Sequence, residues 1–168
     1  MPRFNKKVCK SKMGKGVKKE HHDLVMKYAI ECMRELSDKK YGIGKLDIPF
    51  NVETHYRKEG YGGWGSRRRI LINTFYIDEE RRSCWEYPSH RDCKIIGAFV
   101  ANPELVLKAT VAHEIAHHIQ YAYKDRFSPA MKKELRKPHG LGWKRIYGWL
   151  RSELINPEIR EQKELQAA

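Results

Sequence analysis

The chain has 168 residues, of which 40% are hydrophobic and 33% charged, and its formal net charge at pH 7 is +13. This length is typical of one domain with a substantial core. No stretch approaches roughly 18 consecutive apolar residues, and the Lys-rich N-terminus has no apolar signal core. We therefore predict an intracellular protein (cytoplasm or nucleoid, or nucleus) that is neither secreted nor inserted in a membrane. We also expect a monomer.

The first 19 residues are strongly basic and include no acidic residue. We predict that residues 1–19 form a flexible arm that binds an anionic polymer, most simply single- or double-stranded DNA, through counterion release. The alternatives are a solubilising tail or a targeting signal that a receptor reads. The basic residues that would contact nucleic acid are Arg3, Lys6, Lys7, Lys10, Lys12, Lys15, Lys18 and Lys19.

One helix and two strands are predicted next. Apolar residues recur at three- and four-residue spacing across residues 20–39, which indicates an amphipathic helix. The stretches 48–56 and 67–73 predict two antiparallel strands, with a glycine-rich turn at 60–65 between them. That turn does not resemble a phosphate-binding loop, because no Lys-Ser or Lys-Thr pair follows it.

Residues 78–102 have few periodic signals and are predicted to be a surface insertion. Within them, Cys84, His90 and Cys93 have the spacing C-x5-H-x2-C, which fits no common metal site and lacks a fourth ligand. We therefore expect ordinary surface residues. The four cysteines, Cys9, Cys32, Cys84 and Cys93, form no C-x-x-C pair, which argues against a disulfide framework or a zinc ribbon.

The run 105–123 contains no Gly or Pro and is apolar almost all round, which predicts a buried helix. It contains the motif H-E-x-x-H, in which His113 and His117 point only about 40° apart on a helix and can share one metal ion. Glu114 lies about 100° from His113, where a carboxylate can reach a water on the metal without binding it. The alternative is two core histidines satisfied by hydrogen bonds, and His118 is expected to be a hydrogen-bonded or surface residue.

The rest of the chain is predicted to complete the helical part of the domain. Residues 121–137 form a connection that includes a short helix. Pro138-His139-Gly140 introduces a final amphipathic helix, which Pro157 closes, and residues 161–168 form a frayed tail. A catalytic zinc usually takes three protein ligands and leaves a fourth position to water. His139 is the best third ligand, with Glu134 and Glu153 as alternatives.

His113-Glu114-Ile-Ala-His117, followed by His139-Gly140-Leu-Gly-Trp143-Lys144, resembles the SprT-like family, which includes the Spartan proteases. The likeness covers roughly residues 20–155. It implies a small α+β zincin-type domain over residues 20–160, with a short antiparallel sheet beside the active-site helix. It also implies metallopeptidase activity on proteins crosslinked to DNA, with His113, His117 and His139 as ligands of one Zn²⁺ ion and Glu114 as the catalytic acid/base. In zincins an exposed sheet edge holds the substrate as an added strand.

In the expected mechanism, Glu114 removes a proton from the attacking water and delivers it to the leaving amine. Thr110 and Tyr121 project near the same helix face and are candidates for supporting or oxyanion groups, with simple packing as the alternative. A second hypothesis is a nucleic-acid-binding module with a structural zinc and no turnover. A third is an interaction protein without a metal.

Overall fold

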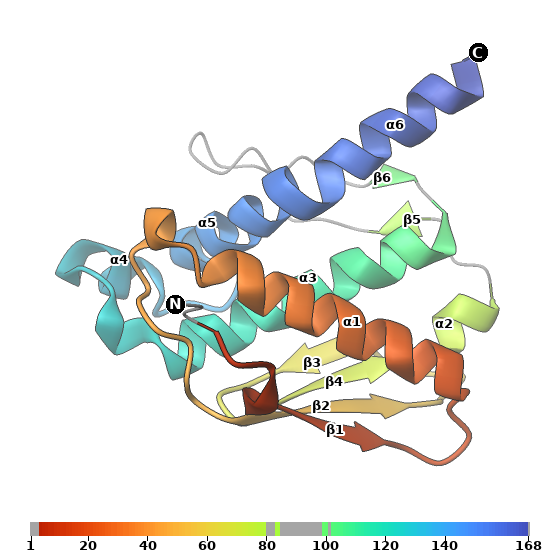
Figure 1. Cartoon of the computed structure of the whole chain (residues 1–168), viewed down its shortest axis with the longest axis horizontal. Coiled ribbons are helices and arrows are strands. Elements are labelled where there is room, and N and C mark those ends of the chain that lie inside the picture. Colours follow the sequence, from red (N-terminus) through yellow and green to blue (C-terminus); the bar gives the residue numbers. More distant parts are fainter. Residues whose placement is uncertain (1–3, 80–82, 85–98, 101, 168) are drawn as a thin grey trace.

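A four-stranded mixed sheet packs against helices in the computed structural model, which describes residues 4–79, 83–84, 99–100 and 102–167 (Figure 1). The strands are β1 (Cys9–Met13), β2 (Phe50–His55), β3 (Gly63–Gly65) and β4 (Arg69–Asn73), arranged in the order β1-β2-β4-β3. A second sheet pairs β5 (Ser83–Cys84) with β6 (Phe99–Val100). The predicted α+β class is confirmed.

The predicted antiparallel pairing of the two longer strands is wrong. Strands β1, β2 and β4 are parallel, and β3 alone is antiparallel to β4. The physical reason lies in the segment that was expected to be a turn. The chain does not turn directly from β2 into β4. The glycine-rich segment instead forms β3 on the far side of β4, and the chain then reverses into β4, which therefore runs parallel to β2.

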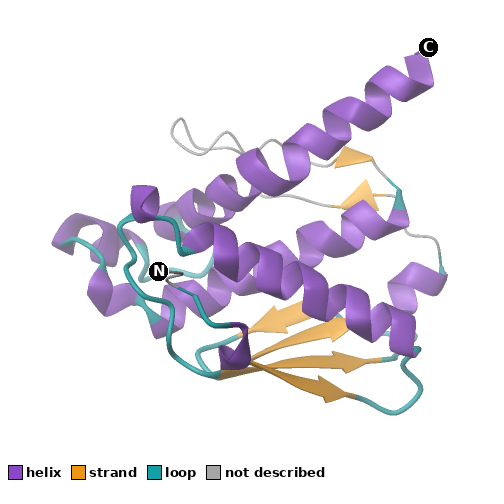
Figure 2. Ribbon diagram, in the orientation of Figure 1, coloured by secondary structure: helices purple, strands orange, loops and turns teal. Residues whose placement is uncertain are grey.

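The helices are α1 (Lys19–Leu36), α2 (Phe75–Asp78), α3 (Pro103–Ala122), α4 (Pro129–Glu134), α5 (Leu141–Leu150) and α6 (Asn156–Ala167). Single 3₁₀ turns occur at Lys6–Val8, Lys39–Tyr41 and Lys124–Arg126. Figure 2 shows the helices gathered on one side of the four-stranded sheet. Helices α1 and α3 lie on the sheet, and α5 packs against α3. The amphipathic α1, the buried α3 and the short helix α4 agree with the sequence pattern.

Residues 9–13 form an edge strand, so the predicted flexible arm is wrong for this segment. Backbone pairing with β2 and burial of Cys9 and Phe4 hold the N-terminal segment against the domain. Periodicity did not show this, because the strand has a single buried side chain. The lysines of this segment remain on the surface and project from an ordered scaffold.

Pro157 does not close the last helix. A π-helical segment, Arg151–Ile155, follows α5, and α6 begins at Asn156 and continues to Ala167. Proline is tolerated in the first turn of a helix, where its missing N–H has no intrahelical partner. Of the predicted 78–102 insertion, His90 and Cys93 lie outside the described residues. No helix in the described ranges is long and apolar enough to cross a membrane.

The two faces of the sheet differ in burial, and this yields a testable prediction. Ile72 is fully buried against the helices, whereas its neighbour Leu71 points to the opposite face and is half-buried. We expect Ile72→Ala to lower the free energy of unfolding by about 2–5 kcal/mol and Leu71→Ala by less than about 1.5 kcal/mol, measured by urea denaturation. Equal losses would show that the two faces of β4 are wrongly assigned.

Candidate metal centre

Helix α3 begins at a side-chain cap and a proline, and burial stabilises it along its length. The Asn102 side chain accepts a hydrogen bond from the backbone N–H of Leu105 at 2.8 Å, and Pro103 occupies the first turn. Most of the helix is buried, including polar residues such as Glu114, His117 and Gln120. Buried polar groups require partners, so the polar residues of this helix mark a site rather than a packing surface.

Three imidazoles meet at this site, two from α3 and one from the loop before α5. The Nε2 atom of His139 lies 3.1 Å from Nε2 of His113 and 2.8 Å from Nε2 of His117. These three residues form a group whose ligand atoms all lie within 4.8 Å of one another. The structure thus brings together the three predicted ligands, although 21 residues separate His117 from His139 in the chain.

His139 has a backbone conformation that aims its side chain at the other two histidines. Its φ is 56°, and it is the one non-glycine residue with positive φ in the described chain. Such a conformation is uncommon outside glycine and asparagine, and it persists where the surrounding structure enforces it. The following Gly140 and Gly142 allow close packing, since a Cβ atom on Gly142 would lie 2.8 Å from the carbonyl carbon of Glu134.

The ring of Trp143 is packed against all three imidazoles. Its centroid lies 4.5 Å from that of His113, 5.1 Å from that of His117 and 4.7 Å from that of His139. Trp143 is fully buried and packs in turn on Tyr147 at 5.0 Å. Helix α5 therefore supplies a rigid aromatic support that restricts the rotation of each imidazole.

Gln120 joins the two halves of the site. Its amide nitrogen donates to the carbonyl oxygens of Leu135 and Lys137, each at 2.9 Å, so that its amide oxygen faces Nδ1 of His117 at 3.0 Å. The oxygen can only accept, so Nδ1 of His117 carries the proton and its Nε2 presents a lone pair to the site. The same amide holds the segment that leads into His139.

The donor set fits a zinc ion. Burial and the neighbouring imidazoles lower the pKa of His113 well below its usual value, and burial lowers the pKa of His117 to about 4. Burial also lowers the pKa of His139. Neutral imidazoles are the form that binds zinc, and nitrogens about 2.0–2.1 Å from a tetrahedral ion lie roughly 3.3 Å apart. The two observed contacts would open by only a few tenths of an ångström.

Glu114 lies on the sheet side of α3, against the edge strand β3. A Cβ atom on Gly63 would lie 2.7 Å from Oε1 of Glu114, and one on Gly65 would lie 2.8 Å from Cβ of His117. Only glycine therefore lets β3 approach the carboxylate this closely. Glu114 is 5% exposed, and burial raises its pKa to about 8.

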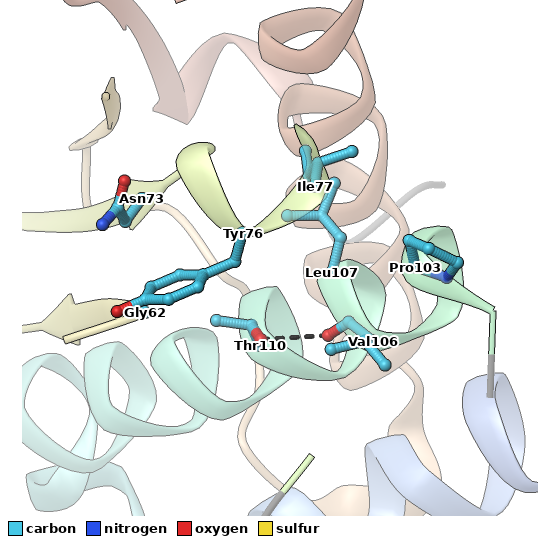
Figure 3. A pocket seen from close by; sticks show the side chains of 8 residues that line it. All are labelled: Gly62, Asn73, Tyr76, Ile77, Pro103, Val106, Leu107 and Thr110. Carbon is cyan, nitrogen blue, oxygen red and sulfur yellow. Dashed lines mark hydrogen bonds between the residues drawn. The ribbon is translucent and has the colours of Figure 1, made fainter. Parts of the chain in front are cut away.

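The two predicted supporting residues differ in their placement. The Tyr121 ring stacks on His117 with a centroid distance of 5.9 Å, and burial raises its pKa. The Thr110 hydroxyl donates to the carbonyl oxygen of Val106 at 2.9 Å. Thr110 also lines a cavity of about 20 Å³, together with residues of α2, the start of α3, Gly62 and Asn73 (Figure 3). Tyr121 is thus beside the histidines, whereas the hydroxyl hydrogen of Thr110 is used within its own helix.

The remaining candidates lie away from the three imidazoles. Glu134 pairs with Arg145 at 3.1 Å and Glu153 with Lys40 at 3.6 Å, and neither belongs to the donor group. His118 is fully buried, stacks on Phe50 at 3.9 Å and has Nδ1 3.1 Å from the carbonyl oxygen of Ser66. His118 is thus a hydrogen-bonded residue, as expected from the sequence.

Sequence reasoning missed Gln120 and the packing role of the β3 glycines. The available signals were a polar residue three positions after His117 on a largely apolar helix, and the glycines at 63 and 65 on either side of Trp64. Comparison with known proteins adds no further constraint: no family model, curated protein or solved structure matches the chain.

The role of Gln120 predicts a loss of metal affinity when its amide is removed. Gln120→Leu keeps the volume but releases both His117 and the segment before His139, so we expect zinc affinity to fall about 10- to 100-fold. Competition with a chromogenic chelator measures this directly. The matched control is Gln166→Leu on the exposed part of α6, which should leave affinity unchanged. Equal affinities for the Gln120 variant and wild type would rule out the clamp.

Burial of Glu114 predicts a pH-dependent gain in stability for the metal-free Glu114→Gln variant. The folded-state pKa of about 8 lies above the ordinary value of 4.5, so the stability present below pH 4.5 is lost as the pH rises toward 8. Glutamine removes this penalty. We expect the chelator-treated variant to exceed wild type in unfolding free energy by about 3 kcal/mol at pH 7 and by less than about 1 kcal/mol at pH 5.

Urea denaturation at the two pH values measures the difference. Glu161→Gln on exposed α6 is the control and should change nothing. A difference that does not shrink between pH 7 and pH 5 would contradict a raised pKa for Glu114.

Proposed function

We propose that the chain is a zinc-dependent metalloendopeptidase with a zincin-like fold, of the SprT-like type. The observation that carries the proposal is the convergence of His113, His117 and His139 beside the buried carboxylate of Glu114. Within the described residues the donor group contains three side chains. Three protein ligands are typical of catalytic zinc, whereas structural zinc usually has four. The arrangement therefore favours an enzyme over a nucleic-acid-binding module with a structural metal.

Each residue has a defined part in the proposed reaction. A bound zinc ion would polarise the scissile carbonyl and lower the pKa of water. Glu114, held in a dry environment against β3, accepts the proton of the attacking water and passes it to the leaving amine. Gln120 fixes the tautomer of His117, and Trp143 restricts the imidazoles to one arrangement.

Strand β3 supports a position for the substrate. It pairs with β4 along one edge, and within the four-stranded sheet its other edge has no strand beside it. Peptides bind such edges by adding a strand, using backbone hydrogen bonds that do not depend on sequence. Because β3 lies directly against Glu114, an added strand would pass close to the carboxylate. We propose protein substrates with little side-chain selectivity, including proteins bound or crosslinked to DNA.

The role of Glu114 is tested by replacing it while retaining the metal. We expect Glu114→Gln to bind one zinc ion with near wild-type affinity and to lower peptide-bond cleavage at least about 100-fold, because it removes the proton acceptor. Cleavage of casein by the zinc-loaded protein, with metal content measured on the same sample, is a suitable assay. Glu153→Gln is the matched control and should cleave at the wild-type rate. Equal rates for Glu114→Gln and wild type would exclude Glu114 as the base.

A further inference from the structure

A small cavity lies beside the start of β3. Its volume is about 20 Å³, and Figure 3 shows the side chains around it. The lining residues are Gly62, Asn73, Tyr76, Ile77, Pro103, Val106, Leu107 and Thr110. Among them Asn73, Val106 and Leu107 are buried, whereas the others are half-buried, so the cavity reaches the surface of the molecule.

The chemistry of the cavity suits an uncharged, apolar group. None of the described residues that line it is charged. The Thr110 hydroxyl donates to the carbonyl oxygen of Val106 at 2.9 Å. The Asn73 amide donates to the carbonyl oxygen of Arg57 at 2.9 Å and accepts from the N–H of the same residue at 3.1 Å. Because these polar groups already have partners within the protein, a polar or charged ligand group would gain little there and would lose its hydration.

The size of the cavity is set by atoms that are held in place. The Tyr76 hydroxyl donates to the carbonyl oxygen of Gly60 at 2.6 Å, and the backbone N–H of Asn73 donates to that of Gly62 at 2.8 Å. In Figure 3 the Tyr76 ring extends from α2 toward Gly62. A volume of about 20 Å³ holds one water molecule or a group of similar size, such as a methyl group. A longer side chain would have to displace Tyr76 or Ile77.

The cavity lies in line with the strand edge that we propose for the substrate. Gly62 and Thr110 both line it, whereas further along β3 a Cβ atom on Gly65 would lie 2.6 Å from the carbonyl oxygen of Glu114. Strand β3 therefore runs along α3 in the same direction. Thr110 precedes Glu114 by about 6 Å along the helix axis, and two residues of an extended peptide span about 6.6 Å. A peptide paired with β3 beside Glu114 would thus bring a side chain about two residues away to the cavity.

We infer that this cavity is a subsite of the proposed peptidase that admits a methyl-sized side chain, so that the enzyme prefers alanine at the second or third residue from the scissile bond. The inference rests on the proposed function and narrows its substrate class to extended segments with a small residue at this position. Backbone pairing with β3 would supply affinity, and the cavity would supply the one restriction on side chains. Glycine would leave the cavity unfilled, and leucine would not fit.

The test maps the sites at which the zinc-loaded full chain cleaves a library of proteome-derived peptides, identified by mass spectrometry. We expect alanine to exceed leucine at this position by at least about 10-fold, because an oversized side chain is rejected by a rigid pocket. Alanine should exceed glycine by about 3-fold, because its methyl group is buried. The preference should occur on one side of the scissile bond only, since the cavity lies on one side of Glu114.

Enlarging the cavity should change the preference in a defined way. Ile77→Ala removes most of one wall, so we expect the excess of alanine over leucine to fall below about 2-fold. The matched control is Ile30→Ala on α1, because both isoleucines are half-buried and packed against the core but only Ile77 lines the cavity. The control should retain the wild-type profile. Thermal unfolding midpoints of both variants show whether each is folded at the assay temperature.

Binding provides a readout that does not depend on turnover. A fluorescein-labelled peptide with the preferred sequence is titrated with the zinc-loaded Glu114→Gln chain and followed by fluorescence anisotropy. Replacing the alanine of this peptide by leucine should weaken binding at least about 10-fold. Adding Ile77→Ala to the protein should restore most of that loss, and adding Ile30→Ala should restore none.

Three results would overturn the subsite and leave the proposed peptidase standing. These are cleavage without a preference at this position, a preference there for large or charged residues, and an equal change of profile in Ile30→Ala and Ile77→Ala. Absence of cleavage in the whole library by the zinc-loaded protein would overturn the subsite and the proposed function together.

Discussion

The contact of His139 with the two imidazoles of α3 is the constraint on which the site depends. A helix can align His113 and His117 by itself, but the third nitrogen comes from a loop that has no regular structure to hold it. Two supports replace that regularity. Gln120 ties the loop backbone to α3, and Trp143 fills the space behind the three rings. The positive φ of His139 shows that the loop adopts a less favourable conformation to complete the group.

Strand β3 links this centre to the rest of the domain through its two faces. Its glycines let the backbone lie against Glu114 and His117, while Trp64 between them points to the face of the sheet opposite the helices. Because successive side chains of a strand point to opposite faces of the sheet, one face of β3 contacts the candidate metal centre and the other carries Trp64.

The sequence predicted the parts of the site that depend on local spacing. The H-E-x-x-H motif defines its own geometry on a helix, and the apolar surroundings of α3 predicted its burial. His139 is the best third ligand that the sequence offers, and the structure brings it to the pair. The role of Gln120 could not be predicted from the sequence. Its partners are the backbone carbonyls of Leu135 and Lys137, and a pattern of side chains does not indicate which backbone groups will be close to it.

The fold was predicted less completely than the site. Strand β1 has one buried residue and four exposed ones, so its order derives from backbone pairing with β2 and not from a hydrophobic pattern. The direction of β4 depended on whether the glycine segment turned directly or crossed β4, and the periodicity of the sequence does not distinguish these two paths. Pro157 was read as a helix end, although proline fits the first turn of α6 equally well.

The most direct test of the central claim is X-ray absorption spectroscopy at the zinc edge, on the reconstituted full chain and on His139→Ala. The account predicts one ion per chain with three imidazole ligands and one water oxygen in the wild type, and two imidazole ligands with weaker binding in the variant. An unchanged imidazole count in His139→Ala, or four protein ligands in the wild type, would contradict it.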